Sequence, residues 1–518
     1  MRTRAWLVLA LTMTMCLARG SSAAAEEAPY QGYTYTEWGK PVPAPNGYLP
    51  DRIITGAATG AGDFKKPQSL FVNQAAQELY VADTGNNRIV VLDAKLGFKR
   101  ELKLFTQNGS GNGNGNGNGN GSGKKQKLKS PTDVFVTPDG TLYIADNGNK
   151  RVVVSDAQGN ILHLFGAPKS DLIPKGFVFQ PEKLVVDSQG RLYIQAFGVF
   201  QGLICLDADG TFLNYFGGNR VEVTPKLLLE LAWKKVLTKA QRNAMESFVP
   251  IEYSNMFIDK EDFIYTTVKT SQNSTDELKK LNPLGINILR ADSSTGYVYE
   301  NNDYGDHPVV YTGENGESKV DSMFVDITVD DDGFISALDA SRGKVFQYDQ
   351  ESNLMFVFGG RGSQQGTFKN PVAVENFGGR LLVLDAEKNN ITAFKLTSFG
   401  EDVRKAVKLY NGGFYKEDLE PWKEVLKRDS NYLLANVGLG KAYYQMGDYV
   451  NAMKYFKLGY DKKDYSDAFK AYYTDQLRAH FVEIFYGLAG LVILYQLFKR
   501  RKRIAAVYRR TRERGIPG

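Results

Sequence analysis

The strongest constraint on the fold is a phrase that occurs twice, at residues 79–93 and 142–156. Each copy begins Leu-Tyr-(Val/Ile)-Ala-Asp, continues as Asp-x-x-Asn-x-Arg, and ends in a second β-rich run. The Asn-Gly and Gly-Asn steps between the two runs supply the positive φ that tight turns require, so each copy predicts a hairpin. Short strands repeated every ~45–70 residues favour stacked sheets or a propeller over one open sheet.

The two copies share a set of polar turn residues. They are Asp83, Asn86, Arg88, Asp146, Asn149 and Arg151. An aspartate in such a turn caps backbone amides, and the nearby arginine can pair with it. We therefore interpret these residues as structural, and they suggest neither a catalytic site nor a metal or cofactor site.

Weaker copies of the phrase extend the pattern over residues 52–396. One unit consists of a proline, an apolar strand, a turn, a Leu-Tyr strand, an Asp turn, a third strand and a strand ending in Phe-Gly. Six such units predict six four-stranded blades. The lone strand at residues 52–56 is expected to complete the last blade, which closes the ring and hides its open edges.

Three insertions interrupt the predicted ring, at residues 108–127, 224–247 and 291–320. The first is a Gly-Asn tract followed by lysines, which predicts a flexible loop. The second has an apolar stripe at helical spacing and predicts a helix packed over one end of the ring, with partner docking as the alternative. The third is acidic and polar; we interpret it as a solvated loop, with a metal or sugar site as the alternative.

These repeats resemble the NHL family of β-propellers. The resemblance rests on Pro-x-x-apolar, Leu-Tyr-(Val/Ile)-Ala-Asp and Asp-x-x-Asn-x-Arg, and it covers roughly residues 52–396. The fifth and sixth copies lack the Asn-x-Arg ending, and the fourth has lost the aspartate. The resemblance implies an all-β six-bladed propeller, and it implies protein–protein contacts as the usual role of such a fold.

Helical periodicity replaces the strand pattern after Leu396. Large and small side chains between residues 399 and 466 are similar to two tetratricopeptide (TPR) repeats, at 399–432 and 433–466, within a helical segment at 397–480. Asp418 stands where that family has alanine. The resemblance implies a small all-α protein-interaction segment, which makes the chain multidomain.

The two ends of the chain predict a secreted protein with a membrane anchor. Residues 1–25 have the basic start, apolar stretch and small-residue end of a signal peptide, and residues 26–51 are expected to be an extended segment. Residues 481–498 are an apolar run of transmembrane length, followed by a basic tail at 499–518. This layout predicts a single-pass protein of a bacterial cell membrane, with an extracytoplasmic body and a cytoplasmic tail.

The charge distribution excludes a nucleic-acid-binding body. The formal net charge is +6, but residues 499–514 carry +8 and the leader carries +3, which leaves −5 for the rest. Three scattered histidines argue against a His-rich metal site. Cys205 lies in an apolar strand and is expected to be buried.

No catalytic set stands out in the sequence. We predict a membrane-anchored scaffold that is not an enzyme, has no cofactor, and binds a protein partner outside the membrane. An accessory role beside a transporter or envelope complex is one form that this scaffold could take. The alternative is a calcium-dependent lactonase or related hydrolase, since six-bladed propellers of that kind gather carboxylates and amides in the central channel. A further alternative is carbohydrate binding, which rests on the 29 tyrosines.

Overall fold

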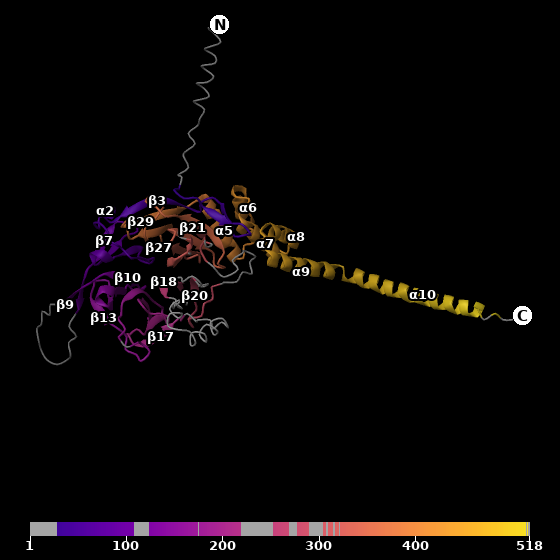
Figure 1. The fold of residues 1–518 in the computed structure, drawn as a ribbon, viewed down its shortest axis with the longest axis horizontal. Coiled ribbons are helices and arrows are strands. Elements are labelled where there is room, and N and C mark those ends of the chain that lie inside the picture. The colour runs from indigo at the N-terminus through magenta and orange to yellow at the C-terminus, as the bar shows by residue number, and fades with distance from the viewer. Residues whose placement is uncertain are drawn as a thin grey trace, which may run out of the picture.

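The computed structural model consists of a β-propeller, a group of short helices packed against its side, and a long helix that projects away (Figure 1). The structure describes residues 28–107, 124–174, 176–218, 252–268, 277–289, 304–306, 309–313, 316–320, 322–513 and 515. The predicted signal peptide, the Gly-Asn tract and the predicted helix at 224–247 lie outside these residues.

The propeller has six blades of antiparallel strands, which are consecutive in the chain in blades 1 to 5, while β3 completes blade 6. Blade 1 consists of β4 (Ser69–Asn73), β5 (Glu78–Asp83), β6 (Arg88–Leu92) and β7 (Phe98–Leu102). Blade 2 consists of β10 (Pro131–Val136), β11 (Leu142–Asp146), β12 (Arg151–Ser155) and β13 (Ile161–Phe165). Blade 3 consists of β14 (Pro181–Val186), β15 (Leu192–Ala196), β16 (Leu203–Leu206) and β17 (Phe212–Phe216). Blade 4 has the described strands β18 (Tyr253–Ile258), β19 (Ile264–Val268) and β20 (Leu278–Leu281). Blade 5 consists of β23 (Phe324–Val329), β24 (Ile335–Asp339), β25 (Lys344–Tyr348) and β26 (Leu354–Gly359). Blade 6 consists of β27 (Pro371–Phe377), β28 (Arg380–Asp385), β29 (Asn390–Leu396) and β3 (Tyr48–Thr55).

The ring closes as predicted, because strand β3 from the start of the chain pairs with β29 from its end. The strand is longer than the predicted 52–56. It begins at Tyr48, since a bulge opposite Phe394 carries the pairing past Pro50. The Tyr48 ring is 3% exposed and stacks on Phe358 of blade 5, with ring centroids 4.7 Å apart. The closing strand therefore pairs within blade 6 and packs against blade 5.

Three hairpins outside the blades correct the sequence predictions. The lysine-rich run at the end of the 108–127 insertion is not loop but strand β9 (Lys124–Lys127), paired with β8 (Leu104–Gln107). Residues 309–320, expected as solvated loop, pair as β21 (Val309–Gly313) and β22 (Gly316–Val320). The segment 26–51, expected to be extended throughout, contains the hairpin of β1 (Tyr33–Tyr35) and β2 (Pro41–Pro43).

The described helices lie mostly in the C-terminal region. They are α2 (Gly56–Thr59), the 3₁₀ turns η1 (Thr84–Asn86) and η2 (Asn147–Asn149), α5 (Ser398–Asn411), α6 (Leu419–Arg428), α7 (Leu433–Gln445), α8 (Tyr449–Leu458), α9 (Lys462–Ala479) and α10 (Phe481–Glu513). Each of the two predicted repeats thus contains one helix pair. A Cβ at Gly438 would lie 2.4 Å from the Trp422 ring, and one at Gly440 would lie 2.5 Å from Phe456, so these glycines allow the helices to pack closely. Membership of the TPR family stays a prediction.

The helix pairs pack directly on blade 5. Phe399 and Tyr432 belong to the same buried cluster as Phe356 and Phe358 of β26. The Tyr432 hydroxyl donates to the Met355 carbonyl at 2.6 Å, and the ammonium group of Lys441 lies 2.5 Å from the Glu351 carboxylate. Burial, a hydrogen bond and an ion pair therefore join helices and propeller into one body.

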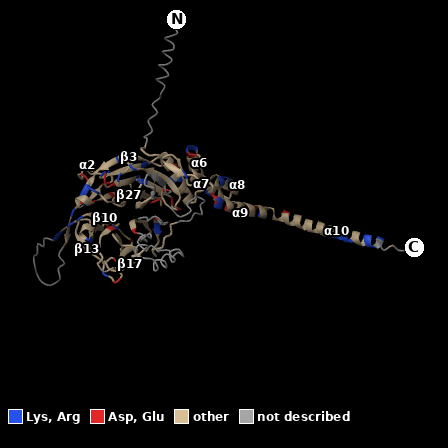
Figure 2. Cartoon of the chain, in the orientation of Figure 1, with Lys and Arg blue, Asp and Glu red and all other residues tan. Residues whose placement is uncertain are grey.

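Helix α10 is the described helix that could cross a membrane by length and composition. Its span Phe481–Arg510 has a mean hydropathy of 1.8 over its most apolar window, and none of that window is buried against the rest of the chain. Lysines and arginines gather at its far end (Figure 2). The helix therefore continues past the predicted end of the span at residue 498, into the basic tail.

Candidate functional site

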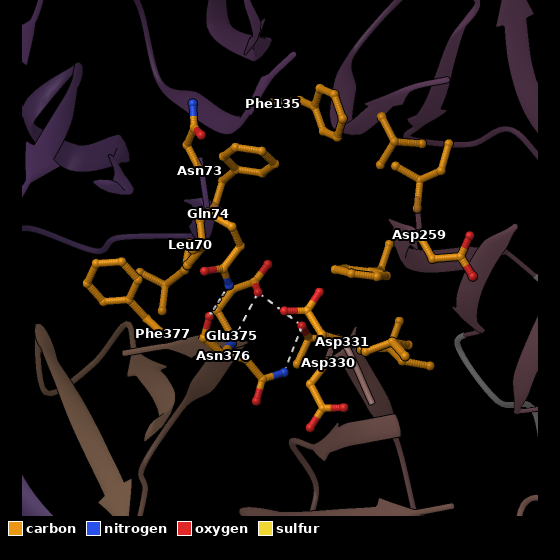
Figure 3. A pocket seen from close by; sticks show the side chains of 18 of the residues that line it. Leu70, Asn73, Gln74, Phe135, Asp259, Asp330, Asp331, Glu375, Asn376 and Phe377 are labelled. Carbon is orange, nitrogen blue, oxygen red and sulfur yellow. Dashed lines mark hydrogen bonds between the residues drawn. The ribbon is translucent and has the colours of Figure 1, made fainter. Parts of the chain in front are cut away.

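A cavity of about 860 Å³ opens at one end of the central channel (Figure 3). Its walls are the innermost strands of the blades, and its rim is formed by the turns that lead from the first to the second strand of each blade. The cavity therefore draws residues from all six blades, and residues far apart in the sequence face one another across it.

The deeper ring of residues occupies one register position in every blade. Each member lies on the first strand of its blade, opposite the fourth residue of the Leu-Tyr phrase on the second strand. Asp133 thus pairs with Ala145, and Asp326 pairs with Leu338. In blade order the ring is Ser69, Asp133, Lys183, Asn255, Asp326 and Ala373. Five of the six are polar, on strands that are otherwise largely apolar.

One half of this ring is a buried network between blades 1, 2 and 3. The Ser69 hydroxyl donates to Asp133 at 2.5 Å, and the Lys183 ammonium group donates to the same hydroxyl oxygen at 3.1 Å. Lys183 also lies 4.0 Å from the Asp133 carboxylate. Burial raises the pKa of Asp133, and the charge of Lys183 opposes that rise. These contacts tie three blades together at the channel floor.

The other half joins blades 4, 5 and 6 through Asp326. Its carboxylate accepts hydrogen bonds from the Asn255 side chain, from the Ile327 amide at 2.8 Å and from the Val374 amide at 2.7 Å. Burial raises the pKa of Asp326 to about 7, although Lys183 lowers it. A carboxylate and an amide from different blades thus meet here.

A second ring lies two residues nearer the rim and has two unlike sides. Phe71, Phe135 and Phe257 come from blades 1, 2 and 4, while Thr328 and Glu375 come from blades 5 and 6. Figure 3 shows Phe135 across the cavity from Glu375. Glu375 Oε2 accepts from the Thr328 hydroxyl at 3.0 Å and from the Asn376 amide at 3.3 Å. Burial, reinforced by the charge of Asp326, raises the pKa of Glu375 to about 8.

The helical segment contributes to the rim of the cavity. Arg404 of α5 pairs with Asp330, donates to the Tyr48 hydroxyl at 2.9 Å and lies 4.3 Å from the centre of the Phe334 ring. Lys408, one turn later on α5, is 2.6 Å from Asp332. The cavity rim and the helices that lead towards α10 are therefore in direct contact.

The six turn residues singled out from the sequence do not line the cavity. Antiparallel pairing places Asp83 and Asp146 at the opposite end of their blades from the rim. Asp83 accepts from Arg88 Nε at 2.6 Å, from the Asn86 side chain at 2.8 Å and from the Lys65 amide at 2.7 Å.

The second copy repeats this arrangement. Asp146 accepts from Arg151 at 2.7 Å, from Asn149 at 2.8 Å and from the Lys129 amide at 2.7 Å. In each copy the three side chains join the turn to the segment that enters the blade.

The 291–320 insertion was expected to be a solvated loop, but in its described part Asp306 contacts the N-terminal hairpin and blade 5. The Asp306 carboxylate accepts from the hydroxyl groups of Tyr33 and Tyr35 and pairs with Arg342 at 2.5 Å and Lys344 at 2.8 Å. Two cations and two phenols thus surround this carboxylate, which joins the N-terminal hairpin to blade 5.

Three kinds of group are accessible in the cavity. Ser69 is 2% exposed and already bonded to Asp133, so an incoming substrate has little access to its hydroxyl. Within the described residues, no group of three or more His, Cys, Asp or Glu side chains is placed to hold a metal ion. What remains accessible is a wall of phenyl rings, a half-buried glutamate and an acidic rim.

Sequence reasoning missed the channel residues, although a signal was present. Each of Pro67, Pro131, Pro181 and Pro371 begins an innermost strand or lies just before one, and the channel-floor residue follows two positions later. A polar residue at that position, as at Asp133 or Lys183, interrupts an apolar strand at the same point in successive repeats. Aligning the repeats on their prolines would have found four of the six ring positions, because blades 4 and 5 have Tyr253 and Phe324 in place of the proline.

Comparisons with known proteins match this geometry in part. A family model for the NHL repeat matches residues 128–154, which include most of the second copy of the phrase. This segment of the chain is similar to an NHL repeat. The curated protein SUPPRESSOR OF QUENCHING 1, chloroplastic, of Arabidopsis thaliana is 25% identical over 191 residues, covering 36% of this chain and only 17% of that protein.

Solved structures with a similar chain path include two propellers. Virginiamycin B lyase from Staphylococcus aureus is 10% identical, covers 64% of this chain and 95% of its own, and gives a TM-score of 0.32. A gluconolactonase from Xanthomonas campestris is 12% identical, covers 68% of this chain and 97% of its own, and gives a TM-score of 0.35. Neither likeness bears on the activity of this chain.

Proposed function

We propose that this protein is a membrane-anchored binding scaffold, which holds a propeller outside the cell membrane and recruits a protein partner through its helical segment. Support comes from the direct packing of α5 and α7 on blade 5 and from the apolar helix α10. A propeller fused to such a helix has a fixed position relative to its anchor. NHL-type propellers are associated with protein interaction, which agrees with this role.

The observation that carries the proposal is an exposed apolar stripe on α9, the helix between the propeller-packed pairs and α10. Four side chains at four-residue intervals form it: Tyr465, Phe469, Tyr473 and Leu477. Their exposed fractions run from 36% to 56%, and the Phe469 and Tyr473 rings stack with centroids 6.3 Å apart. Side chains four residues apart share one helix face, so the stripe offers a continuous surface to a partner.

Photocrosslinking in intact membranes tests this role. We expect p-benzoylphenylalanine at position 469 to form one discrete protein adduct, which Tyr473→Ala weakens at least threefold. The matched control is the same label at Asp467, which is exposed on the opposite face of α9. Equal adducts from both positions, or adducts with lipid alone from position 469, would contradict a partner-binding stripe.

A second candidate, a calcium-dependent lactonase-like hydrolase, is favoured by the meeting of Asp133, Asn255, Asp326 and Glu375 in one channel. Such an enzyme needs oxygen ligands from several blades at one point. A preformed calcium site would raise the Tm of the purified protein by several degrees in millimolar calcium, and the rise would be lost in Asp326→Asn. Lactone hydrolysis that depends on calcium would then replace the scaffold proposal.

A further inference from the structure

The channel cavity has an aromatic wall and a carboxylate facing it, two features that a protein-binding surface does not require. One wall is apolar: Phe71, Phe135 and Phe257 stand at the same register level, and each is partly exposed. The Phe71 and Phe135 rings lie 5.0 Å apart, centre to centre. The opposite wall carries the Glu375 carboxylate. An aromatic surface that faces a carboxylate across an open space is the arrangement that binds organic cations.

The charge around the cavity points in the same direction. Nine carboxylate side chains line it, against three basic ones, Lys260, Arg380 and Arg404. Charges of both signs are partly paired, since Arg380 pairs with Asp51 at 2.7 Å and Arg404 with Asp330, while Asp187 pairs with Arg191 at 2.6 Å and Asp332 with Lys408 at 2.6 Å. Lys183 lies 4.0 Å from Asp133 at the floor, so carboxylates remain in excess but are not alone. Low-dielectric walls of one sign focus the field into the cavity, so a cation is drawn in and an anion is repelled.

The contacts of Glu375 leave room for such a ligand. Oε2 accepts the hydrogen bonds from both Thr328 and Asn376, and Oε1 accepts no hydrogen bond from the described residues. Burial and the neighbouring Asp326 raise the pKa of Glu375 to about 8, and the hydrogen bonds from Thr328 and Asn376 offset this rise only in part. A bound cation would favour the ionised carboxylate and release its proton.

An organic cation fits this cavity better than a metal ion or a neutral sugar. Phenyl rings do not coordinate calcium or zinc, yet their faces attract an ammonium group. The volume of about 860 Å³ is also far larger than a bare ion needs. A neutral sugar would draw no benefit from the excess of carboxylates.

We propose that the channel cavity binds an organic ammonium group, held between the phenyl rings of Phe71, Phe135 and Phe257 and the carboxylate of Glu375. The group belongs either to a free small amine or to a lysine side chain of a protein that inserts into the channel. This site is separate from the stripe on α9, and its existence does not depend on the partner proposed there.

Titration calorimetry on the full chain in detergent tests the proposal, with choline and its neutral isostere 3,3-dimethylbutan-1-ol as probes. We expect choline to bind at least tenfold more tightly than the isostere. The isosteric variant Glu375→Gln should weaken choline binding at least tenfold, and Phe135→Leu should weaken it about fivefold. At pH 7, binding to the wild type should release protons into the buffer, whereas binding to Glu375→Gln should not.

The matched control is Asp209→Asn in an exposed turn of blade 3 that does not line the cavity, which should change choline binding less than threefold because solvent screens its charge. A second probe, Nα-acetyl-lysine methylamide, separates the two sources: tighter binding than choline indicates a lysine side chain, and weaker binding a free amine. The proposal is overturned if choline and its isostere bind equally, if Glu375→Gln binds as the wild type does, or if no cation binds.

Discussion

Asp83→Ala should lower the free energy of unfolding by about 3–5 kcal/mol, because it removes one partner of a buried ion pair. Asp83 is fully buried, and Arg88, which is 7% exposed, also bonds to the Ala61 carbonyl and to Glu101 at 3.0 Å. The substitution leaves the guanidinium without its main counter-ion and leaves the Lys65 amide unbonded. Urea unfolding of the full chain in detergent measures the loss.

The matched comparison is Asp339→Ala in blade 5. Asp339 bonds the Met323 amide at 3.0 Å and the Ser341 amide at 2.8 Å, but Arg342 beside it pairs with Asp306 instead. Asp339→Ala should therefore lower the free energy of unfolding by only about 1–2 kcal/mol, which is the usual effect of losing hydrogen bonds to backbone amides. In a double-mutant cycle, Asp83→Ala and Arg88→Ala together should cost less than their sum. Equal losses at Asp83 and Asp339 would show that the arginine contributes nothing.

Asp418→Asn should stabilise the helical segment by about 2–4 kcal/mol at pH 8 and have no effect at pH 4. Asp418 is fully buried at the start of α6, and neither carboxylate oxygen has a hydrogen-bond partner within the described residues. Burial, together with Glu417, raises its pKa to about 7.

The direction of this pH dependence follows from the raised pKa of Asp418. Below about pH 4 the carboxyl is protonated in both folded and unfolded states, so it has no effect on stability. As the pH rises towards 7 the unfolded state ionises first, and the wild type loses stability that Asn would keep. Thermal unfolding of both proteins at the two pH values measures the difference.

The control for Asp418→Asn is Glu420→Gln on the first turn of the same helix. Glu420 has an exposed side chain paired with Lys423, so its replacement should leave stability almost unchanged at either pH. Equal stabilisation of Asp418→Asn at pH 4 and pH 8 would rule out ionisation as its cause.

The sequence predicted the blade architecture because each blade repeats the same local chemistry. Period-two strands, Asp turns and Phe-Gly endings are set by neighbours along the chain, and ring closure followed from an unpaired strand at each end. The hairpins β8–β9 and β21–β22 were missed because one strand of each is mostly polar and carries no apolar alternation, as Lys124–Lys127 illustrates.

The cavity was harder to predict because its residues are brought together only by the ring. Ser69, Asp133 and Lys183 are 50 or more residues apart, and each looks like a single polar interruption in its own strand. Arg404 could not have been assigned to the rim, since its position depends on how α5 packs against blade 5. Asp418 was recognised as unusual for its position, but its complete burial required the structure.

A topology measurement tests most directly whether this is an extracytoplasmic scaffold held by one membrane helix. With Cys16 and Cys205 replaced by serine, single cysteines are introduced as Ala94→Cys on the propeller surface and Arg512→Cys at the end of α10. An impermeant maleimide applied to intact cells should label Ala94→Cys at once and Arg512→Cys only after permeabilisation. Labelling of both positions on intact cells, or of Arg512→Cys alone, would contradict the proposed arrangement.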